Sequence, residues 1–522
     1  MTSSEELAAL ARGVIGVGFS GSTAAAAPLD ALHAFAPGAV ILFARNVGSA
    51  DELRELVAAL RSTAPVAPLV AVDQEGGRVE RIGAGAAALP SAMAVGATGD
   101  VALAARLGAL LGRDLARLGI GVDLAPVADL SLQPRSTVVG TRAFGDDPER
   151  VAAFAAAFAG GLEDAGVAAT FKHFPGHGST AEDSHVTLPR VTADAATLRA
   201  RDLVPFARAI AGRPPSLMLT AHVVLAAFDP ERPATLSPAV LTGLLRRELG
   251  YDGVVVTDCL EMDAIANGVG TVRGAVEALA AGADLLLISH HLDLAAAAAA
   301  AIVAAVREGE IPAARLEAAH ARVAALRERL ARPQPAPAAV DEAAPHEAAR
   351  RAVTVVRGEP ALRAGKPVTV ISFEGTAVDN VAASGGRRAA PEPASLSSAL
   401  RRRGWKSEIM RVALEPARED VELLLEHVPA LGDREFVIVT RDAHLRPAQR
   451  DAVARILELA PDALVVSAHT PYDALLWPQA RRVACIYGSG GVSLEGCADV
   501  LAGRALAGGR LPVRLPQDAA VR

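Results

Sequence analysis

The chain has 522 residues, of which 51% are apolar and 21% are charged, the balanced composition of a globular protein with a large core. This length is comfortable for two domains. The net charge of −7 argues against a nucleic-acid binder, whose binding surface would be basic. No apolar run has the roughly 18 residues needed to cross a bilayer. The N-terminus carries Glu5 and Glu6 without a basic segment, so we expect no signal peptide and a cytoplasmic protein without membrane contact.

Eight short apolar runs, each followed by a segment of helical composition, extend to about residue 290. They lie at 14–19, 39–43, 69–75, 121–127, 167–174, 217–223, 254–258 and 284–289. This alternation predicts βα units on a parallel sheet. A (β/α)8 barrel is favoured over a doubly wound open sheet, because polar residues end many of the runs and barrel enzymes place their sites there. Helices are expected over the alanine run 295–305 and over 313–331, where the barrel ends.

A segment of linker composition, PQPAPAAVDEAAP at 333–345, follows the barrel. We therefore expect a barrel domain over 1–332, a linker over 333–345 and a second domain over 346–522. Strand-like runs at 353–356, 368–372, 436–440, 463–468 and 483–488 predict that the second domain is a smaller α/β sandwich. Its sequence has no dense cluster of His, Asp, Glu or Cys, so the chemistry is expected in the barrel.

The densest group of polar residues is the stretch KHFPGHGSTAEDSHVTLP at 172–189. Its proline and glycines exclude a regular helix, so the stretch is expected to leave the fifth strand as a loop. Imidazoles and a carboxylate could bind zinc, but two histidines four residues apart on a loop lack the usual helical geometry of a metalloprotease. Purely structural histidines are the other alternative. The histidines concerned are His173, His177 and His185.

The interpretation we favour pairs Asp183 with His185. The carboxylate can accept a hydrogen bond from one ring nitrogen and so fix the tautomer and raise the basicity of the other. An imidazole with a pKa of about 6.5 can both donate a proton to a leaving group and remove one from water. The loop is therefore predicted to supply a general acid/base.

A second group of polar residues lies in GVVVTDCLEMDAI at 253–265. Asp258 ends an apolar strand, where a carboxylate beside a dry core is costly without a role. The alternative is that Asp258 caps the following helix, on which Glu261 and Asp263 are expected to be solvated. The three cysteines, Cys259, Cys485 and Cys497, show no metal-ligand spacing, so buried thiols in a reducing compartment are expected.

Other polar residues suit a polyhydroxylated ligand. DQEGGRVER at 73–81 offers Asp73 and Arg81 around a glycine turn, and VVGTRAF at 138–144 offers Arg142. Lys172 is one of only three lysines in the chain, and His222 follows the sixth run. A carboxylate that bonds vicinal hydroxyls, with cationic donors beside it, matches the needs of a sugar.

Taken together, these strings resemble the NagZ-like branch of glycoside hydrolase family 3. The resemblance covers about 12–325 in order and is carried by GAVILFARN at 38–46, AVDQEGGRVER at 71–81, LAPVADL at 124–130, GTRAFGDDP at 140–148, KHFPGHG followed by DSH, and RELGYDGVVVTD at 247–258. SLEGCADVLAGRALAGGRLPVRLP at 493–516 is similar to the closing segment of the family's second domain. The sequence differs from the pattern at Cys259, where some members have Asp or Ala, and at 131–137.

The resemblance implies a retaining β-N-acetylhexosaminidase without metal or cofactor. Asp258 would be the nucleophile that forms a covalent glycosyl-enzyme, and His185, oriented by Asp183, would replace the usual carboxylate acid/base. The residues expected to bind the N-acetylglucosamine are Asp73, Arg81, Arg142, Lys172 and His173. The substrate would be a small carbohydrate or a muropeptide released during peptidoglycan recycling.

Three alternatives stay open at this point. An imidazole does not repel an anionic acceptor as a carboxylate would, so phosphate could replace water and make the enzyme a phosphorylase. A β-glucosidase or β-xylosidase of the same family is disfavoured by the DSH string at 183–185. An inactive sugar-binding protein is disfavoured because both Asp258 and His185 are present.

Overall fold

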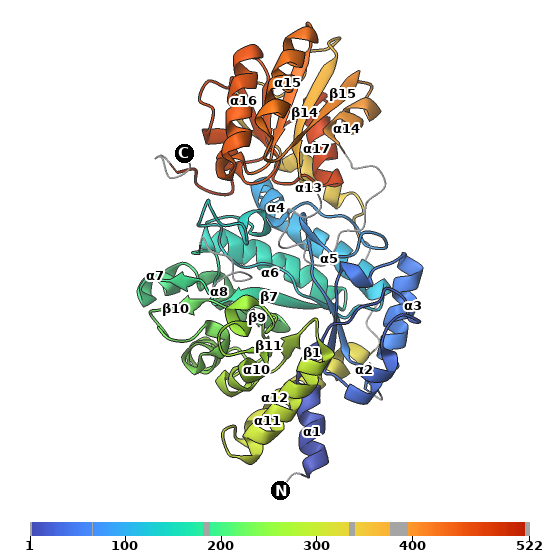
Figure 1. Ribbon diagram of the computed structural model, residues 1–522, viewed down its shortest axis with the longest axis vertical. Helices are drawn as coiled ribbons and strands as arrows, with labels where there is room; N and C mark the ends of the chain where they lie inside the picture. The colour runs from blue at the N-terminus through green and yellow to red at the C-terminus, as the bar shows by residue number, and fades with distance from the viewer. Residues whose placement is uncertain (1–2, 65, 181–187, 333–339, 376–394, 517–522) are drawn as a thin grey trace.

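The computed structural model describes residues 3–64, 66–180, 188–332, 340–375 and 395–516 (Figure 1). Its first part is a barrel of eight parallel strands that neighbour one another in chain order. β12 pairs with β1, and a bridge from Val256 to Leu285 closes the ring, so the barrel prediction is confirmed and the open sheet is wrong. Each predicted run contains one strand of the barrel: β1 (Ile15–Val17), β2 (Ala39–Leu42), β3 (Leu69–Val72), β6 (Val122–Asp123), β7 (Ala168–Phe174), β9 (Leu217–Thr220), β11 (Val254–Val256) and β12 (Leu286–Ile288).

The side chains of these strands alternate between the inside of the barrel and the surrounding helices. Ile41 faces the interior cluster, whereas its neighbours Val40 and Leu42 belong to the larger core around the barrel. Helix α12 (Ala313–Ala331) adds Val323 and Leu326 to the interior cluster. This helix lies against the residues that precede β2 and β6, so it closes the amino-terminal end and leaves the carboxyl ends of the strands for a site.

The helices around the barrel begin with local sequence signals. α3 begins after Ser49, whose hydroxyl accepts from the N–H of Glu52 in a capping box, and α6 begins with a proline after the cap Asp147. The helices of this part are α1 (Ser4–Gly13), α2 (Leu29–Phe35), α3 (Ala50–Arg61), α4 (Ala92–Thr98), α5 (Val101–Arg117), α6 (Pro148–Asp164), α7 (Ala195–Ala200), α8 (Val204–Ala211), the π-helix η4 (Ala239–Glu248), α9 (Asp263–Ala266), α10 (Thr271–Ala281) and α11 (Leu292–Arg307). Two small sheets pair β4 (Gln74–Gly76) with β5 (Val79–Glu80) and β8 (Arg190–Val191) with β10 (Val224–Leu225).

The second part is built on a six-stranded sheet in the order β13-β18-β17-β16-β14-β15. Only β13 runs antiparallel to its neighbour. The five predicted runs correspond to β13 (Thr354–Arg357), β14 (Val368–Glu374), β16 (Glu435–Thr440), β17 (Leu464–Ser467) and β18 (Arg482–Cys485). The sequence did not predict β15 (Ser407–Ala413), because this edge strand pairs only with β14 and none of its residues is fully buried.

Helices cover both faces of this sheet, so the predicted α/β sandwich is confirmed. Phe373 and Ile438 face one apolar cluster with α15 and α16, whereas Val370 and Val439 face another with α14 and α17. The helices are α13 (Ala344–Ala352), α14 (Leu396–Arg402), α15 (Arg418–Ala430), α16 (Pro447–Leu459) and α17 (Gly491–Leu501).

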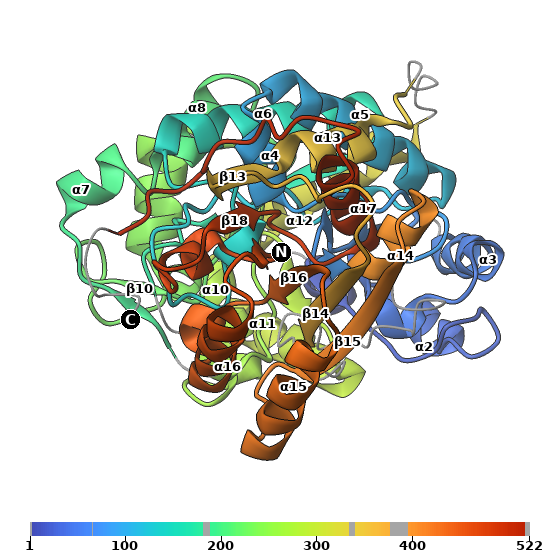
Figure 2. The same ribbon diagram turned by 90° about the horizontal axis from the view of Figure 1, so that it is seen from above.

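The second part lies over α4, α5 and α6 of the barrel part (Figure 1). Seen from above, its sheet and helices overlie the barrel (Figure 2). Met93, Ala94 and Ala97 of α4 share one apolar cluster with residues of the second sheet, and Ser91 Oγ donates to the carbonyl of Tyr487 at 2.6 Å. The domain boundaries at 332 and 345 stay a prediction, since residues 333–339 lie outside the described residues. In the described part of the chain, none of the helices combines the length and apolarity that a membrane span requires.

Candidate active site

Polar side chains from several barrel strands meet at the open, carboxyl end of the barrel. Asp73 directly follows β3, Lys172 and His173 lie in the last half of β7, and Asp258 comes two residues after β11. Parallel strands bring their carboxyl ends to one mouth, which is where barrel enzymes bind ligands. The structure therefore brings together predicted site residues that are up to 185 positions apart in the sequence.

A buried network of charges forms the floor of this mouth. Lys172 Nζ lies 2.8 Å from Asp73 Oδ1 and 2.6 Å from Glu75 Oε1. Arg142 holds Glu75 with two hydrogen bonds, Nε to Oε2 at 2.8 Å and Nη2 to Oε1 at 2.7 Å. Asp73 is the most exposed member, with 19% of its side chain accessible, so it is the carboxylate best placed to accept hydroxyl groups of a ligand.

The charges of this network fix its protonation states. Burial by itself raises the pKa of Glu75, but the charges and hydrogen bonds of Arg142 and Lys172 outweigh it and hold the pKa well below its usual range. Burial likewise lowers the pKa of Lys172, yet Asp73 and Glu75 raise it above its ordinary value. At neutral pH the site therefore presents fixed, paired charges. The sequence predicted no role for Glu75, although this residue lies only three positions after the end of β3.

Asp129 orients His173, near the end of β7, and His177, in the loop that follows this strand. Its Oδ2 lies 2.6 Å from His173 Nδ1, and its Oδ1 accepts the backbone N–H of His177 at 2.7 Å. Because Asp129 accepts a hydrogen bond from Nδ1, the ring proton of His173 lies on Nδ1. Its Nε2 then faces Arg142 Nη2, 3.4 Å away. Burial lowers the pKa of His177 to about 4, so this imidazole is neutral at physiological pH. Asp129 is thus a positioning residue that the sequence marked only as the end of a run.

Arg81 lies near the exposed side of the charge network. Its Nη2 is 4.0 Å from Asp73 Oδ2. The side chain of Gln74 holds this segment, because its Oε1 accepts from the backbone N–H groups of Arg81 and Ile82 at 2.8 and 3.0 Å. The sequence predicted no role for Gln74, because a lone glutamine carries no distinguishing pattern.

Asp258 is half-buried at the end of β11, and its Oδ1 accepts the N–H of Cys259 at 2.8 Å. The alternative that it caps the next helix is wrong, since the cap residue of α9 is Met262. His222 supports this turn instead of facing a ligand: its Nε2 is bonded to the carbonyl of Cys259 at 3.0 Å and its Nδ1 to Thr235 Oγ1 at 2.8 Å. Asp183 and His185 lie outside the described residues, so their pairing stays a prediction.

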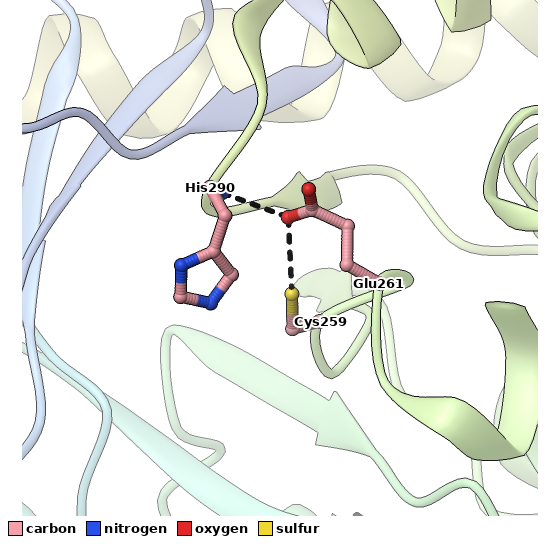
Figure 3. A group of neighbouring side chains, drawn as sticks. All are labelled: Cys259, Glu261 and His290. Carbon is pink, nitrogen blue, oxygen red and sulfur yellow. Dashed lines mark hydrogen bonds between the residues drawn. The ribbon is translucent and has the colours of Figure 1, made fainter. Parts of the chain in front are cut away.

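Glu261 differs from its expected position. It lies before α9 rather than on it, and only 8% of its side chain is exposed. Its Oε2 accepts the N–H of His290 at 2.8 Å and the thiol of Cys259 at 3.6 Å (Figure 3). Cys259 is only partly buried, whereas Cys485 and Cys497 are fully buried as predicted, and all three thiols are free.

The second part of the chain also gathers polar residues, contrary to the expectation from its sequence. His469 Nδ1 lies 2.8 Å from Asp442 Oδ2, and His444 Nδ1 lies 3.0 Å from Asp473 Oδ1. These residues follow β16 and β17 or precede β18 at the side facing the barrel. His444 Nε2 reaches the carbonyl of Pro134 at 2.9 Å, eight residues before Arg142. The cluster thus contacts the segment that carries one of the site arginines.

The model of the glycosyl hydrolase family 3 N-terminal domain matches residues 21–326. The chain belongs to glycoside hydrolase family 3. Its activity class is therefore that of a glycoside hydrolase. A β-hexosaminidase of Xylella fastidiosa strain 9a5c is 43% identical over 281 residues, which cover 52% of this enzyme and 82% of the relative. A β-hexosaminidase of Pseudomonas aeruginosa strain LESB58 is 45% identical over 267 residues, 51% of this enzyme and 79% of the relative.

Solved structures extend the similarity to the second part. The family 3 β-N-acetylglucosaminidase of Paenibacillus sp. strain FPU-7 is 35% identical, covers 98% of this enzyme and 99% of its own chain, and gives a TM-score of 0.89. A β-N-acetylhexosaminidase of Beutenbergia cavernae is 33% identical over 62% of this enzyme and 98% of its own chain, with a TM-score of 0.55. The fold of this enzyme, in both of its parts, is thus that of the Paenibacillus enzyme.

Proposed function

We propose that this enzyme is a retaining β-N-acetylhexosaminidase that removes terminal β-linked N-acetylglucosamine. The observation that carries the proposal is the half-buried carboxylate of Asp258, which follows β11 at the same mouth as the Lys172–Asp73 and Arg142–Glu75 ion pairs. A nucleophile and a rigid set of sugar-binding charges at one barrel mouth suit glycoside cleavage. The names of the β-hexosaminidase relatives support the choice of an acetylated sugar.

In the proposed mechanism Asp258 attacks the anomeric carbon and displaces the leaving oxygen. The N–H of Cys259, bonded to Asp258 Oδ1, orients the carboxylate, one oxygen of which forms the glycosyl ester. His185, with Asp183 at its other nitrogen, protonates the leaving oxygen and then removes a proton from the water that hydrolyses the ester. Net retention follows from two inversions at the same carbon.

The sugar is proposed to lie over the charge network. Asp73 accepts its hydroxyl groups, and Arg81, Arg142 and Lys172 donate to it. His173, whose Nδ1–H is bound to Asp129, offers Nε2 as an acceptor. Because the donors and His173 are already paired with carboxylates, they keep fixed positions and lose little conformational freedom on binding. Fragments of peptidoglycan inside the cell are the proposed natural substrates.

The deciding experiment compares nitrophenyl β-N-acetylglucosaminide with nitrophenyl β-glucoside. We expect the acetylated substrate to be preferred, and Asp258→Asn to lower kcat at least about 1,000-fold, since the covalent route is lost. Asp263→Asn, an exposed carboxylate on α9, is the matched control and should keep the wild-type rate. Preference for the glucoside, or full activity without Asp258, would contradict the proposal.

The role of His185 is tested by trapping. With a good leaving group, glycosylation of His185→Ala needs little acid assistance, while hydrolysis of the ester still needs a base. Mass spectrometry should therefore find Asp258 carrying one N-acetylglucosaminyl group in this variant. An unmodified Asp258 under steady turnover would count against both assignments. Formation of sugar 1-phosphate in phosphate buffer, absent from an uncharged buffer, would identify the phosphorylase alternative.

A further inference from the structure

A thiol, a carboxylate and an imidazole from two adjacent barrel loops converge beside Asp258. One ligand atom from each of Cys259, Glu261 and His290 lies within 4.8 Å of the other two (Figure 3). We propose that these side chains form a binding site for a divalent ion of the zinc class, and that the bound ion inhibits glycoside hydrolysis. This site is separate from the histidine loop at 172–189, and none of its three side chains takes part in the proposed chemical steps.

The spacing of the ligand atoms fits zinc. In tetrahedral coordination, with bonds of about 2.3 Å to sulfur and about 2.1 Å to oxygen, the two ligand atoms are about 3.6 Å apart. Cys259 Sγ and Glu261 Oε2 are separated by 3.6 Å. A sulfur, an oxygen and a nitrogen are the donor types that zinc prefers, and three protein ligands leave the fourth position open to water.

Neighbouring groups hold the carboxylate in place for this role. His291 Nδ1 lies 2.6 Å from Glu261 Oε1, and the backbone N–H of His290 donates to Oε2 at 2.8 Å. Such contacts to a ligating carboxylate raise metal affinity by fixing its orientation. His290 is exposed to solvent, so an ion can reach the site from outside. On binding, the ion replaces the thiol proton of Cys259, which leaves to the buffer.

The charge of nearby Arg45 does not prevent binding. Its guanidinium donates to the carbonyl of Phe19 at 2.9 Å and to that of Ser289 at 2.8 Å, so it is already held by backbone acceptors. Binding exchanges the thiol proton for a dication, so the ligand set changes from one negative charge to none. The occupied site is therefore neutral, and it lies beside an arginine that is held in place by its backbone acceptors.

The inhibitory effect follows from the place of Cys259 in the chain and rests on the proposed function. The N–H of Cys259 is bonded to Asp258 Oδ1 at 2.8 Å. The ligand atoms lie up to 4.8 Å apart, so an ion that draws Cys259, Glu261 and His290 together shifts this N–H, and with it the carboxylate, away from the orientation used for attack. Coordination thus ties the β11 and β12 loops together at the nucleophile.

Calorimetric titration of chelator-treated full-length enzyme with zinc tests the site. We expect one equivalent to bind, and Cys259→Ser, Glu261→Gln and His290→Gln each to weaken binding at least about tenfold. Cadmium should produce the absorption of a metal thiolate in the wild type but not in Cys259→Ser. His427→Gln, an exposed histidine on α15, is the control and should bind as the wild type does. Thermal melting identifies any variant that fails to fold.

The activity measurement separates this inference from the proposed function. Zinc should lower the rate on the nitrophenyl substrate, a chelator should restore it, and the three ligand variants should resist inhibition at zinc concentrations that inhibit His427→Gln. Binding that survives all three substitutions would overturn the site. Binding that leaves hydrolysis unchanged would overturn the inhibitory role. An enzyme that binds zinc but hydrolyses neither substrate would refute the proposed function and leave the site standing.

Discussion

Buried charges at the barrel mouth are stable only as a network. Glu75, Arg142 and Lys172 each have less than 10% of their side chains exposed. An isolated buried charge would be strongly unfavourable, and each of these is offset by at least one opposite charge within 2.8 Å. The ion pairs that offset the cost of burying these charges also fix the positions of the groups proposed to bind the sugar.

Removing the charge of Glu75 should therefore destabilise the protein. We expect Glu75→Gln to lower the free energy of unfolding by about 3–5 kcal/mol, because Arg142 and Lys172 would be left without their shared partner. Denaturant unfolding at neutral pH measures this change. Glu149→Gln, which breaks an exposed pair with Arg208, is the matched control and should cost less than about 1 kcal/mol. Equal losses in the two variants would show that the network adds no stability.

The pKa of Asp123 is raised, whereas that of Glu75 is lowered. It is fully buried, its Oδ1 accepts the N–H of Gln74, and its Oδ2 has no partner among the described residues. Burial raises the pKa of Asp123 well above its ordinary value, despite the lowering effects of the Gln74 hydrogen bond and the Lys172 charge. The folded protein thus keeps a proton that the unfolded chain releases near pH 4.

The stability contributed by this proton is present below the unfolded pKa and is lost as the pH rises through the folded pKa. Above about pH 4, we expect the free energy of unfolding of Asp123→Asn to fall less steeply with pH than that of the wild type. The amide keeps a hydrogen-bond acceptor but has no proton to lose. Urea unfolding across pH 4–8 measures the slope. Asp433→Asn, an exposed carboxylate, should leave the slope as in the wild type. An unchanged slope in Asp123→Asn would mean that Asp123 is ionised in the folded state.

At the scale of elements, α5 and α6 pack closely because glycines face the partner helix. A Cβ added at Gly161 of α6 would lie 2.3 Å from the carbonyl oxygen of Ala105 on α5. The neighbouring Gly160 faces outward, and its nearest contact would be Arg213 Nη1 at 3.7 Å. Gly161 is therefore required for the close packing of the two helices, whereas the space around Gly160 would admit a side chain.

Alanine substitution should separate these roles. Gly160→Ala should raise the free energy of unfolding by up to about 1 kcal/mol, because alanine favours the helix. Gly161→Ala gains the same propensity but must push α5 away, so we expect a net loss of about 1–3 kcal/mol. Thermal and denaturant unfolding of the two single variants measure the difference. Stabilisation by both substitutions would contradict the close packing of α5 against α6.

At the scale of the whole molecule, the second domain is attached through both apolar and polar contacts. The apolar cluster of α4 with the second sheet is supplemented by His444, which links Asp473 of one domain to the carbonyl of Pro134 in the other. Burial lowers the pKa of His444, but the hydrogen bond and charge of Asp473, together with Asp442, outweigh it and raise the pKa above its ordinary value. The protonated imidazole can donate to both partners at once.

The stability that His444 contributes should depend on pH. It is fully present below the unfolded pKa of about 6.5 and is lost as the pH rises through the higher folded pKa. His444→Gln should therefore cost more at pH 6 than at pH 9, with a difference of about 1–2 kcal/mol. The midpoint of thermal unfolding at each pH checks this, with His427→Gln as the exposed control. The same loss at both pH values would show that His444 is neutral in the folded protein.

The sequence predicted regular elements well and side-chain partners poorly. Runs such as 69–75 and 254–258 were recognisable as strands because buried parallel strands are continuously apolar. The edge strand β15 lacks such a run and was not predicted. Asp73, Lys172 and Asp258 could be selected because polar residues at the ends of apolar strands are costly without a purpose. Glu75, Gln74 and Asp129 were not assigned roles, because those roles depend on partners distant in the sequence.

The barrel, the second domain and the family resemblance could be predicted from the sequence, because hydrophobic periodicity and motif order are local properties of the chain. Only the tertiary structure decided that Glu261 is a nearly buried neighbour of Cys259 and His290, that His222 supports the turn after β11, and that His444 reaches the barrel. These facts depend on which strand ends and loops meet at the barrel mouth, and the distance between two side chains there bears no relation to their separation along the chain.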